Sequence, residues 1–201
     1  KIFRLAKTSH VLVLNPDTVL SKNCINELIN QAKIIKGKFA IIAPSEKKII
    51  EKKLIEVDHV KGFSMLINLS KIKKVKMFDE NFFLYLEEID LCKRLKSASE
   101  KIYICCKARI THLGAKSSNI GFEFEKCRNW HWMWSKVYYN IKHRGYFYAF
   151  KKAFLIISFN YLKGMYFFFV NEKKSTIYFL RASGMFHAIT RKNSWYRPRL
   201  N

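Results

Sequence analysis

Residues 78–94 constrain most strongly what this chain can fold into. The segment is rich in aromatic residues and delivers three carboxylates, Glu87, Glu88 and Asp90, into the start of an apolar pattern with helical spacing. Arg94 follows Asp90 by four residues, so the two side chains can pair on one helix face. The free N–H groups and the dipole of a helix start favour ionised carboxylates, the form that a general base needs. The pattern predicts a helix over residues 87–97, either with a catalytic carboxylate in its first turn or with a simple acidic start.

Two other predicted strands are followed by residues that can bind a ligand. The apolar run 11–14 is typical of a buried strand and stops abruptly at Asn15 and Asp17. Residues 101–106 predict a second strand, and His112 follows it. Ligands of open α/β sheets bind at the carboxyl ends of the strands, so we expect Asp17 and His112 at the same sheet edge. A common turn and a structural histidine are the alternatives.

The remaining pattern predicts an α/β fold with a mixed sheet and an α-helical C-terminal portion. Ser21 is a plausible N-cap for the first helix. The other expected elements are a helix over 22–36, strands over 39–43 and 63–68, a short helical turn after residue 68, a helix over 122–142 and two or more amphipathic helices at the end of the chain.

In this order, the motifs resemble the family 2 glycosyltransferases with the GT-A fold, particularly the bacterial branch that includes rhamnosyltransferase-like enzymes of surface-polysaccharide assembly. The similar segments are 11–18, 60–67, 78–83, 85–94, 111–114 and 129–132. The resemblance implies the C-terminal part of a GT-A catalytic domain over residues 1–145. It also implies that the nucleotide-recognising half, expected before Lys1, is missing, so that the chain is a fragment of an enzyme or the product of a truncated gene.

The resemblance gives the carboxylates of the 87–97 helix a role. Glu88 stands at the catalytic-base position, where the family more often has aspartate, and Glu87 and Asp90 are the alternatives. Sugar transfer from a nucleotide-diphosphate donor needs an acceptor hydroxyl that loses its proton and a diphosphate whose growing charge is neutralised. The implied reaction is a single displacement with inversion onto a glycan or lipid-linked acceptor, in cell-surface polysaccharide synthesis.

The resemblance also implies how the donor is held. Asp17 matches the second acid of the family's Asp-x-Asp motif, which holds a divalent cation, Mg²⁺ or Mn²⁺, on the donor's two phosphates; Asn15 replaces the first acid. His112 resembles a further metal ligand. Gly62 and Phe63 match the segment that approaches the donor sugar, because glycine permits close backbone contact.

The charge of the chain is concentrated at its aromatic end. The formal net charge is +23, and after Glu125 fifteen Lys or Arg residues face a single acid, Glu172. Basic residues beside Trp, Tyr and Phe suit an anionic membrane surface, so we expect residues 146–201 to attach the protein to the inner face of the cell membrane. The apolar stretch 154–170 is interrupted by polar residues, which favours an in-plane helix or a helical hairpin over a spanning helix.

Two other functions fit part of the pattern. A chain without its donor-binding half could be a catalytically inactive, membrane-associated interaction module. Basic and aromatic residues can also bind single-stranded nucleic acid, but no RNA-binding or helix-turn-helix signature accompanies them here, so no nucleic-acid partner is expected. The five cysteines include no Cys-x-x-Cys pair, which indicates core thiols in a reducing cytoplasm and makes a zinc site improbable.

Overall fold

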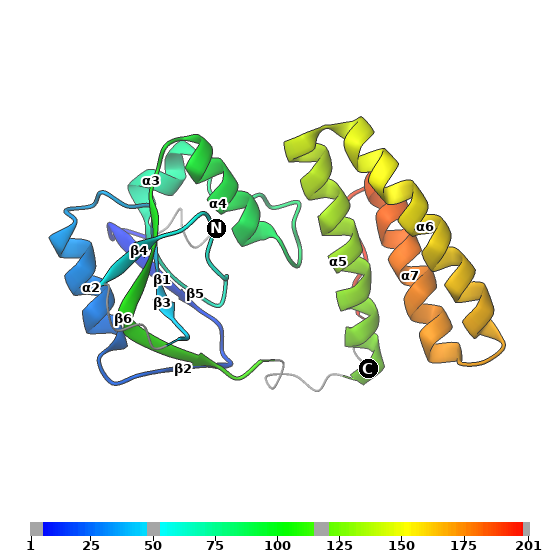
Figure 1. Ribbon diagram of the computed structural model, residues 1–201, viewed down its shortest axis with the longest axis horizontal. Coiled ribbons are helices and arrows are strands. Elements are labelled where there is room, and N and C mark those ends of the chain that lie inside the picture. Colours follow the sequence, from blue (N-terminus) through cyan, green and yellow to red (C-terminus); the bar gives the residue numbers. More distant parts are fainter. Residues whose placement is uncertain (1–5, 48–52, 115–120, 199–201) are drawn as a thin grey trace. The chain divides into compact units, whose positions relative to one another are not determined.

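A computed structural model describes residues 6–47, 53–114 and 121–198, which form two compact units (Figure 1). The first unit contains the described residues up to Asp79 and from Glu87 to Gly114. The second contains residues 80–86 and the described residues from Gly121 onward. The functional division expected at residue 145 stays a prediction.

The first unit is built on a mixed sheet, as the sequence predicts. Its described strands follow the order β1-β5-β3-β6-β2, and β4 also pairs with β6. The β3–β6 pair is parallel, whereas the other pairs are antiparallel. The strands are β1 (His10–Leu14), β2 (Thr18–Leu20), β3 (Ile41–Ser45), β4 (Leu54–Glu56), β5 (Ser64–Asn68) and β6 (Ile102–His112).

Helices cover both faces of this sheet because its central strands are apolar on both sides. Neighbouring residues of a strand point to opposite faces, and Ile41 and Ile42 of β3 enter two different cores. Ile41 packs with Leu91 and its neighbours on α4. Ile42 packs with Leu28 on α2. The helices described in this unit are α2 (Cys24–Ile34), α3 (Leu69–Lys74) and α4 (Glu87–Ser97).

The boundaries of these elements agree with the sequence in part. The predicted helix 87–97 is α4, without any shift. The helix expected over 22–36 is shorter, and Ser21 does not cap it: Asn23 is the N-cap residue, without a side-chain cap, while the Ser21 carbonyl accepts from Cys24 N–H at 2.9 Å. The strand expected over 39–43 runs from Ile41 to Ser45.

The strand expected over 101–106 is longer and includes His112. Its first half pairs with β3 and β4, and its second half pairs with β2. The pattern of residues 107–111 alternates polar and apolar side chains, with Ala108 and Ile110 buried and Lys107 and Thr111 exposed. This period-two signal was present in the sequence and indicates a half-buried strand.

The second unit is helical. It contains α5 (Gly121–Arg144), α6 (Tyr146–Phe168) and α7 (Glu172–Ile189), and α7 packs along both other helices (Figure 1). Its core is formed by Trp130 and Trp134 of α5 with Met185 and Ile189 of α7 and Ala153 of α6. The helices predicted after residue 120 are therefore confirmed.

Candidate active site

Asp17 and His112 meet because β2 and β6 pair as antiparallel neighbours. The turn after β1 leads directly into β2, and Thr18 stands opposite His112 in the register. Leu113 N–H donates to the Asp17 carbonyl at 2.9 Å. The side chains then approach, with His112 Nε2 at 3.2 Å from Asp17 Oδ2, and Asp17 is only 9% exposed. The two residues singled out from the sequence thus form one cluster at one edge of the sheet.

Phe63 and Asn15 join the same cluster. The Phe63 ring stacks on the His112 ring, with 4.7 Å between centroids and 17° between planes. Asn15 N–H donates to the Phe63 carbonyl at 2.8 Å, and the Asn15 carbonyl accepts from Thr18 Oγ1 at 2.7 Å. Asn15 is exposed, and its backbone fixes the turn that carries Asp17. The stacked Phe63 ring limits how the imidazole can turn.

Gly62 packs directly against Glu88. A Cβ atom built on Gly62 would lie 3.4 Å from Glu88 Cγ, in van der Waals contact with the carboxylate side chain. The backbone N–H groups of Gly62, Glu88 and Ile89 all donate toward the Glu88 carboxylate. The Gly62 backbone therefore reaches a carboxylate at the start of α4, and adjacent Phe63 links that carboxylate to the Asp17–His112 cluster.

Burial raises the pKa of both glutamates at the start of α4. For Glu88 the largest cause is desolvation, and the Glu87 charge adds to it, while the three N–H donors act in the opposite direction. For Glu87 desolvation is again the largest cause. Its Oε2 atom is buried without a hydrogen-bond partner in the described part of the chain. The helix-start N–H groups of Glu88 and Ile89 favour the ionised form of Glu88, as expected, but desolvation is the larger effect on its pKa.

Asp90 is occupied by a structural ion pair. Its side chain is fully buried, and Arg94 approaches Asp90 Oδ2 through Nη2 at 2.7 Å and Nε at 2.8 Å. Arg94 Nη1 also donates to the Val75 carbonyl, next to the end of α3. The pairing predicted at four-residue spacing is confirmed. Because Asp90 holds α4 in place, Glu87 and Glu88 are the better candidates for accepting a proton.

The Asp17–His112 cluster has the donor atoms that a divalent cation uses. Within the described ranges, no group of three or more His, Cys, Asp or Glu side chains comes close enough to hold a metal ion. Mg²⁺ is commonly held by one or two protein carboxylates together with substrate phosphates and water. One carboxylate and one imidazole, 3.2 Å apart, fit a cation whose remaining ligands come from a diphosphate.

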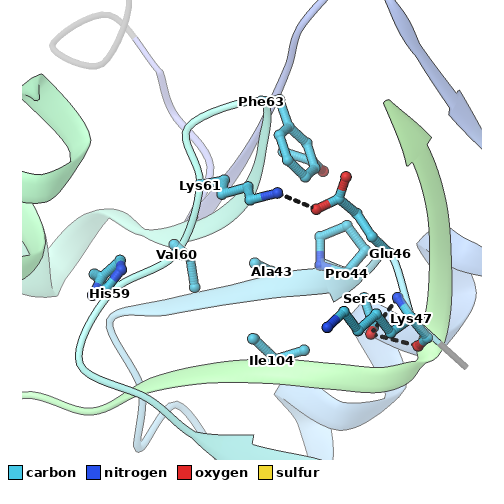
Figure 2. A pocket seen from close by; sticks show the side chains of 11 residues that line it. Ala43, Pro44, Ser45, Glu46, Lys47, His59, Val60, Lys61, Phe63 and Ile104 are labelled. Atoms are coloured by element: carbon cyan, nitrogen blue, oxygen red, sulfur yellow. Dashed lines mark hydrogen bonds and ion pairs between the residues drawn. The ribbon is translucent and has the colours of Figure 1, made fainter. Parts of the chain in front are cut away.

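A pocket of about 410 Å³ opens next to Phe63 (Figure 2). Lys61 reaches across to Glu46, with 2.5 Å between Nζ and Oε2. The Ser64 hydroxyl is buried in the pocket wall and has no hydrogen-bond partner among the residues described. The pocket thus combines an apolar wall with a few polar groups. Its lining residues are Ala43, Pro44, Ser45, Glu46, Lys47, His59, Val60, Lys61, Phe63, Ser64 and Ile104.

Sequence reasoning missed the way in which the chain enters α4. Residues 80–86 pack on the helices of the second unit: Ser135 Oγ donates to the Leu84 carbonyl at 2.7 Å, and Arg128 Nε donates to Tyr85 Oη at 2.6 Å. Tyr85 and Leu86 have φ of 69° and 66°, in the left-handed region that side chains other than glycine disfavour. The next residue is Glu87. No local sequence signal marks this strain, because tertiary contacts maintain it.

Comparison with known proteins finds two partial similarities, both to glycosyltransferases. No family model matches the chain. It is 36% identical to the rhamnosyltransferase WbbL of Escherichia coli K12, over 37% of this chain and 28% of that protein. It is 30% identical to the low-salt glycan biosynthesis hexosyltransferase Agl10 of Haloferax volcanii, over 47% of this chain and 39% of that protein. The chain therefore spans well under half the length of either relative, and these partial similarities support a role in glycosyl transfer.

Proposed function

We propose that the first unit carries the catalytic portion of an inverting glycosyltransferase of GT-A type. It would transfer a sugar from a nucleotide-diphosphate donor to a glycan or lipid-linked acceptor in cell-surface polysaccharide synthesis. The observation that carries the proposal is the convergence of the Asp17–His112 pair, Phe63, and the Gly62–Glu88 contact within one unit. The partial similarity to two glycosyltransferases supports it independently.

Glu88 is the proposed general base. The acceptor hydroxyl gives its proton to the Glu88 carboxylate while its oxygen bonds to the anomeric carbon, and the bond from that carbon to the donor diphosphate breaks. A carboxylate whose pKa is raised by burial is a stronger base, which favours this proton transfer. The N–H donors of Gly62 and Ile89 orient the carboxylate. One base and one displacement invert the configuration at the anomeric carbon.

Asp17 and His112 are the proposed ligands of Mg²⁺ or Mn²⁺. When bound, the cation neutralises the charge that develops on the leaving diphosphate. Phe63 limits the rotation of the His112 imidazole by stacking on it, and Asn15 ties the turn that carries Asp17 to the Phe63 backbone. These contacts hold both ligands in place before the donor binds, so that little ordering is needed on binding.

The pocket beside Phe63 is the proposed place for a sugar ring. Its volume of about 410 Å³ is within the usual range of small-molecule sites, about 300–1,000 Å³. Phe63 offers an aromatic surface to the apolar face of a sugar. The Ser64 hydroxyl is buried in the pocket wall and lacks a partner among the residues described. Lys61 and Glu46 supply further donors and acceptors at the same pocket.

We also propose that the protein works on the cytoplasmic face of the cell membrane, where a lipid-linked acceptor would be anchored. The support is compositional: the second unit combines many basic residues with many exposed aromatic ones. Among the described residues, no helix has the length and apolar character needed to cross a bilayer.

The test of the transfer reaction is release of nucleoside diphosphate from a panel of uridine, guanosine and thymidine diphosphate sugars, with Mn²⁺ or with a chelator. We expect one donor class to be turned over only with the divalent cation. The variant Asp17→Ala should lose at least about tenfold in rate, whereas Glu125→Ala, an exposed acid on α5, should leave it unchanged. Turnover that is indifferent to the cation and to Asp17 would refute the assigned metal ligands, and no turnover of any donor would refute the proposed reaction.

A further inference from the structure

Helix α6 exposes most of its large apolar side chains, which a helix that faces water normally buries. Its buried residues are Ala149, Ala153, Asn160 and Gly164, all small or polar, and only Tyr146, Ile156 and Ile157 add large, partly buried side chains to the core. A surface helix of a globular protein normally buries its large apolar side chains and exposes the polar ones. In α6 most of the large side chains are exposed instead.

The outward face of α6 is dominated by aromatic and aliphatic residues. Phe154 is 58% exposed, Leu162 is 59% exposed and Phe168 is 66% exposed. Leu155 and Tyr166 are 72% and 65% exposed. Scattered exposed apolar residues are normal, but a continuous apolar face along more than three helical turns marks a surface that meets another apolar phase.

The contact between α6 and α7 resembles packing between helices in lipid. A Cβ atom added to Gly164 would lie 2.8 Å from the Phe179 ring of α7, so the glycine leaves room for that ring against α6. Ser175 Oγ of α7 donates to the Gly164 carbonyl at 2.8 Å. Small residues and hydrogen bonds between helices are the usual means of association where the outer surface is apolar.

The charges around this face identify what it meets. Residues 146–189 contain six Lys or Arg residues and one acid, Glu172. Lys151 and Lys152 are exposed near the start of α6, and Lys173 and Lys174 are exposed just beyond its end. Lys163 lies 4.4 Å from the centroid of the Phe159 ring. Basic groups at both ends of an aromatic face complement a surface of anionic headgroups above acyl chains.

We propose that α6 is an in-plane membrane helix, with its outward face inserted among the lipids of an anionic bilayer and the lysines at its two ends on lipid phosphates. The helices α5 and α7 then lie on the side away from the lipid acyl chains. This inference deepens the membrane part of the proposed function and rests on that part, but it does not depend on the transfer reaction.

The test is sedimentation of the protein with vesicles of phosphatidylcholine, with and without phosphatidylglycerol. We expect the parent to bind the anionic vesicles, with a salt-sensitive and a salt-resistant component. The triple variant Phe154→Ser, Leu162→Ser, Phe168→Ser should weaken binding by at least about tenfold, because burial of these three large side chains would supply a substantial part of the apolar contribution.

A matched control replaces three exposed apolar residues elsewhere, Ile25→Ser, Ile34→Ser and Phe186→Ser, which are 45%, 64% and 53% exposed. This control should bind as the parent does. A second variant, Lys151→Gln with Lys152→Gln, leaves the apolar residues of α6 unchanged. It should lose part of the preference for vesicles that contain phosphatidylglycerol. Circular dichroism melting curves check that each variant is folded.

The outcomes separate this inference from the proposed function. If the parent and both α6 variants bind vesicles equally well, the proposed role of α6 is overturned, but the membrane location is not. Parent protein that binds no vesicles would overturn the membrane location as well. Self-association that depends on the α6 face, without vesicle binding, would show that a second copy of the chain covers it and would also overturn the inference. Nucleoside diphosphate release reports on the transfer reaction independently.

Discussion

Glu88 combines two environments that act against each other. Three backbone N–H groups donate toward its carboxylate and favour the ionised form, whereas burial and the neighbouring Glu87 raise its pKa. Burial is the larger effect. The folded protein therefore maintains a carboxylate that is more basic than one in water, at a cost in stability whenever that carboxylate is ionised.

This cost predicts how stability depends on pH. Because the folded-state pKa of Glu88 is raised above its ordinary value of 4.5, the folded state binds the proton more tightly than the unfolded state. The stability contribution is fully present below pH 4.5 and is lost as pH rises through the folded-state pKa. Glu88→Gln should therefore be more stable than the parent at about pH 7, and the difference should shrink toward about pH 4.

Urea unfolding at the two pH values measures this effect. Glu125→Gln, on an exposed residue of α5, is the control and should change the free energy of unfolding little at either pH. A Glu88→Gln protein less stable than the parent at neutral pH would show that the N–H bonds to the carboxylate outweigh its burial.

At the scale of single elements, the sequence predicted the helices and strands whose local apolar pattern is enough to define them. The helix over 87–97 was found without a shift, because its apolar residues recur at helical spacing and Leu91, Cys92 and Leu95 are all buried. The length of β6 was missed although its second half alternates in polarity. Pairing with β2 makes this half a strand, and that pairing depends on the preceding turn at residues 15–17.

The end of α2 gives a test in which one substitution has opposite effects at two positions. Lys36, just beyond the helix, has φ of 46°, which glycine adopts without strain. Lys33 is exposed within the last turn of α2. Lys36→Gly should stabilise the protein by about 0.5–1 kcal/mol, and Lys33→Gly should destabilise it by about 1 kcal/mol.

Thermal melting of the two glycine variants checks this pair. Both remove one positive charge from the same exposed helix end, so the general effect of charge is matched. Destabilisation of the same size in both variants would contradict the left-handed conformation at Lys36.

Gly184 determines how closely α7 can approach α5. A Cβ atom at this position would lie 2.4 Å from the Trp130 carbonyl oxygen, which is backbone and cannot rotate away. Gly184→Ala should therefore lower the free energy of unfolding by about 2 kcal/mol or more, because the helices must separate.

Gly164→Ala is the matched comparison, since its Cβ atom would meet only the side chain of Phe179. It should cost less than Gly184→Ala in the same urea titration, because a ring can shift. Equal stability of the parent and Gly184→Ala would contradict the close α5–α7 contact.

At the scale of the whole molecule, the sequence predicted the participants of the candidate site better than their surroundings. Asp17 and His112 were expected at one sheet edge because each closes a strand, and the structure places them 3.2 Å apart. The pocket beside Phe63 was not predicted, because it depends on how β3, β6 and the segment before β5 enclose a space.

Composition predicted that the second unit is helical, but it did not predict how its helices pack. The sequence predicted amphipathic helices, yet α6 buries small residues and exposes large ones, so a conventional amphipathic pattern does not describe it. The strained residues Tyr85 and Leu86 were also unpredictable, because Tyr85 is held by a hydrogen bond from Arg128 and a ring contact with Trp132, both distant in the sequence.

The most direct test of the central claim compares turnover and donor binding in the parent and in Glu88→Gln. A general base acts in the transition state and typically contributes about 10²–10⁴ to the rate, so turnover should fall at least about a hundredfold. The donor dissociation constant, measured by calorimetry with Mn²⁺, should change little, because Glu88 is not assigned to the donor. Unchanged turnover in Glu88→Gln would contradict the account and transfer the role of base to Glu87, whose buried carboxylate oxygen has no partner in the described part of the chain.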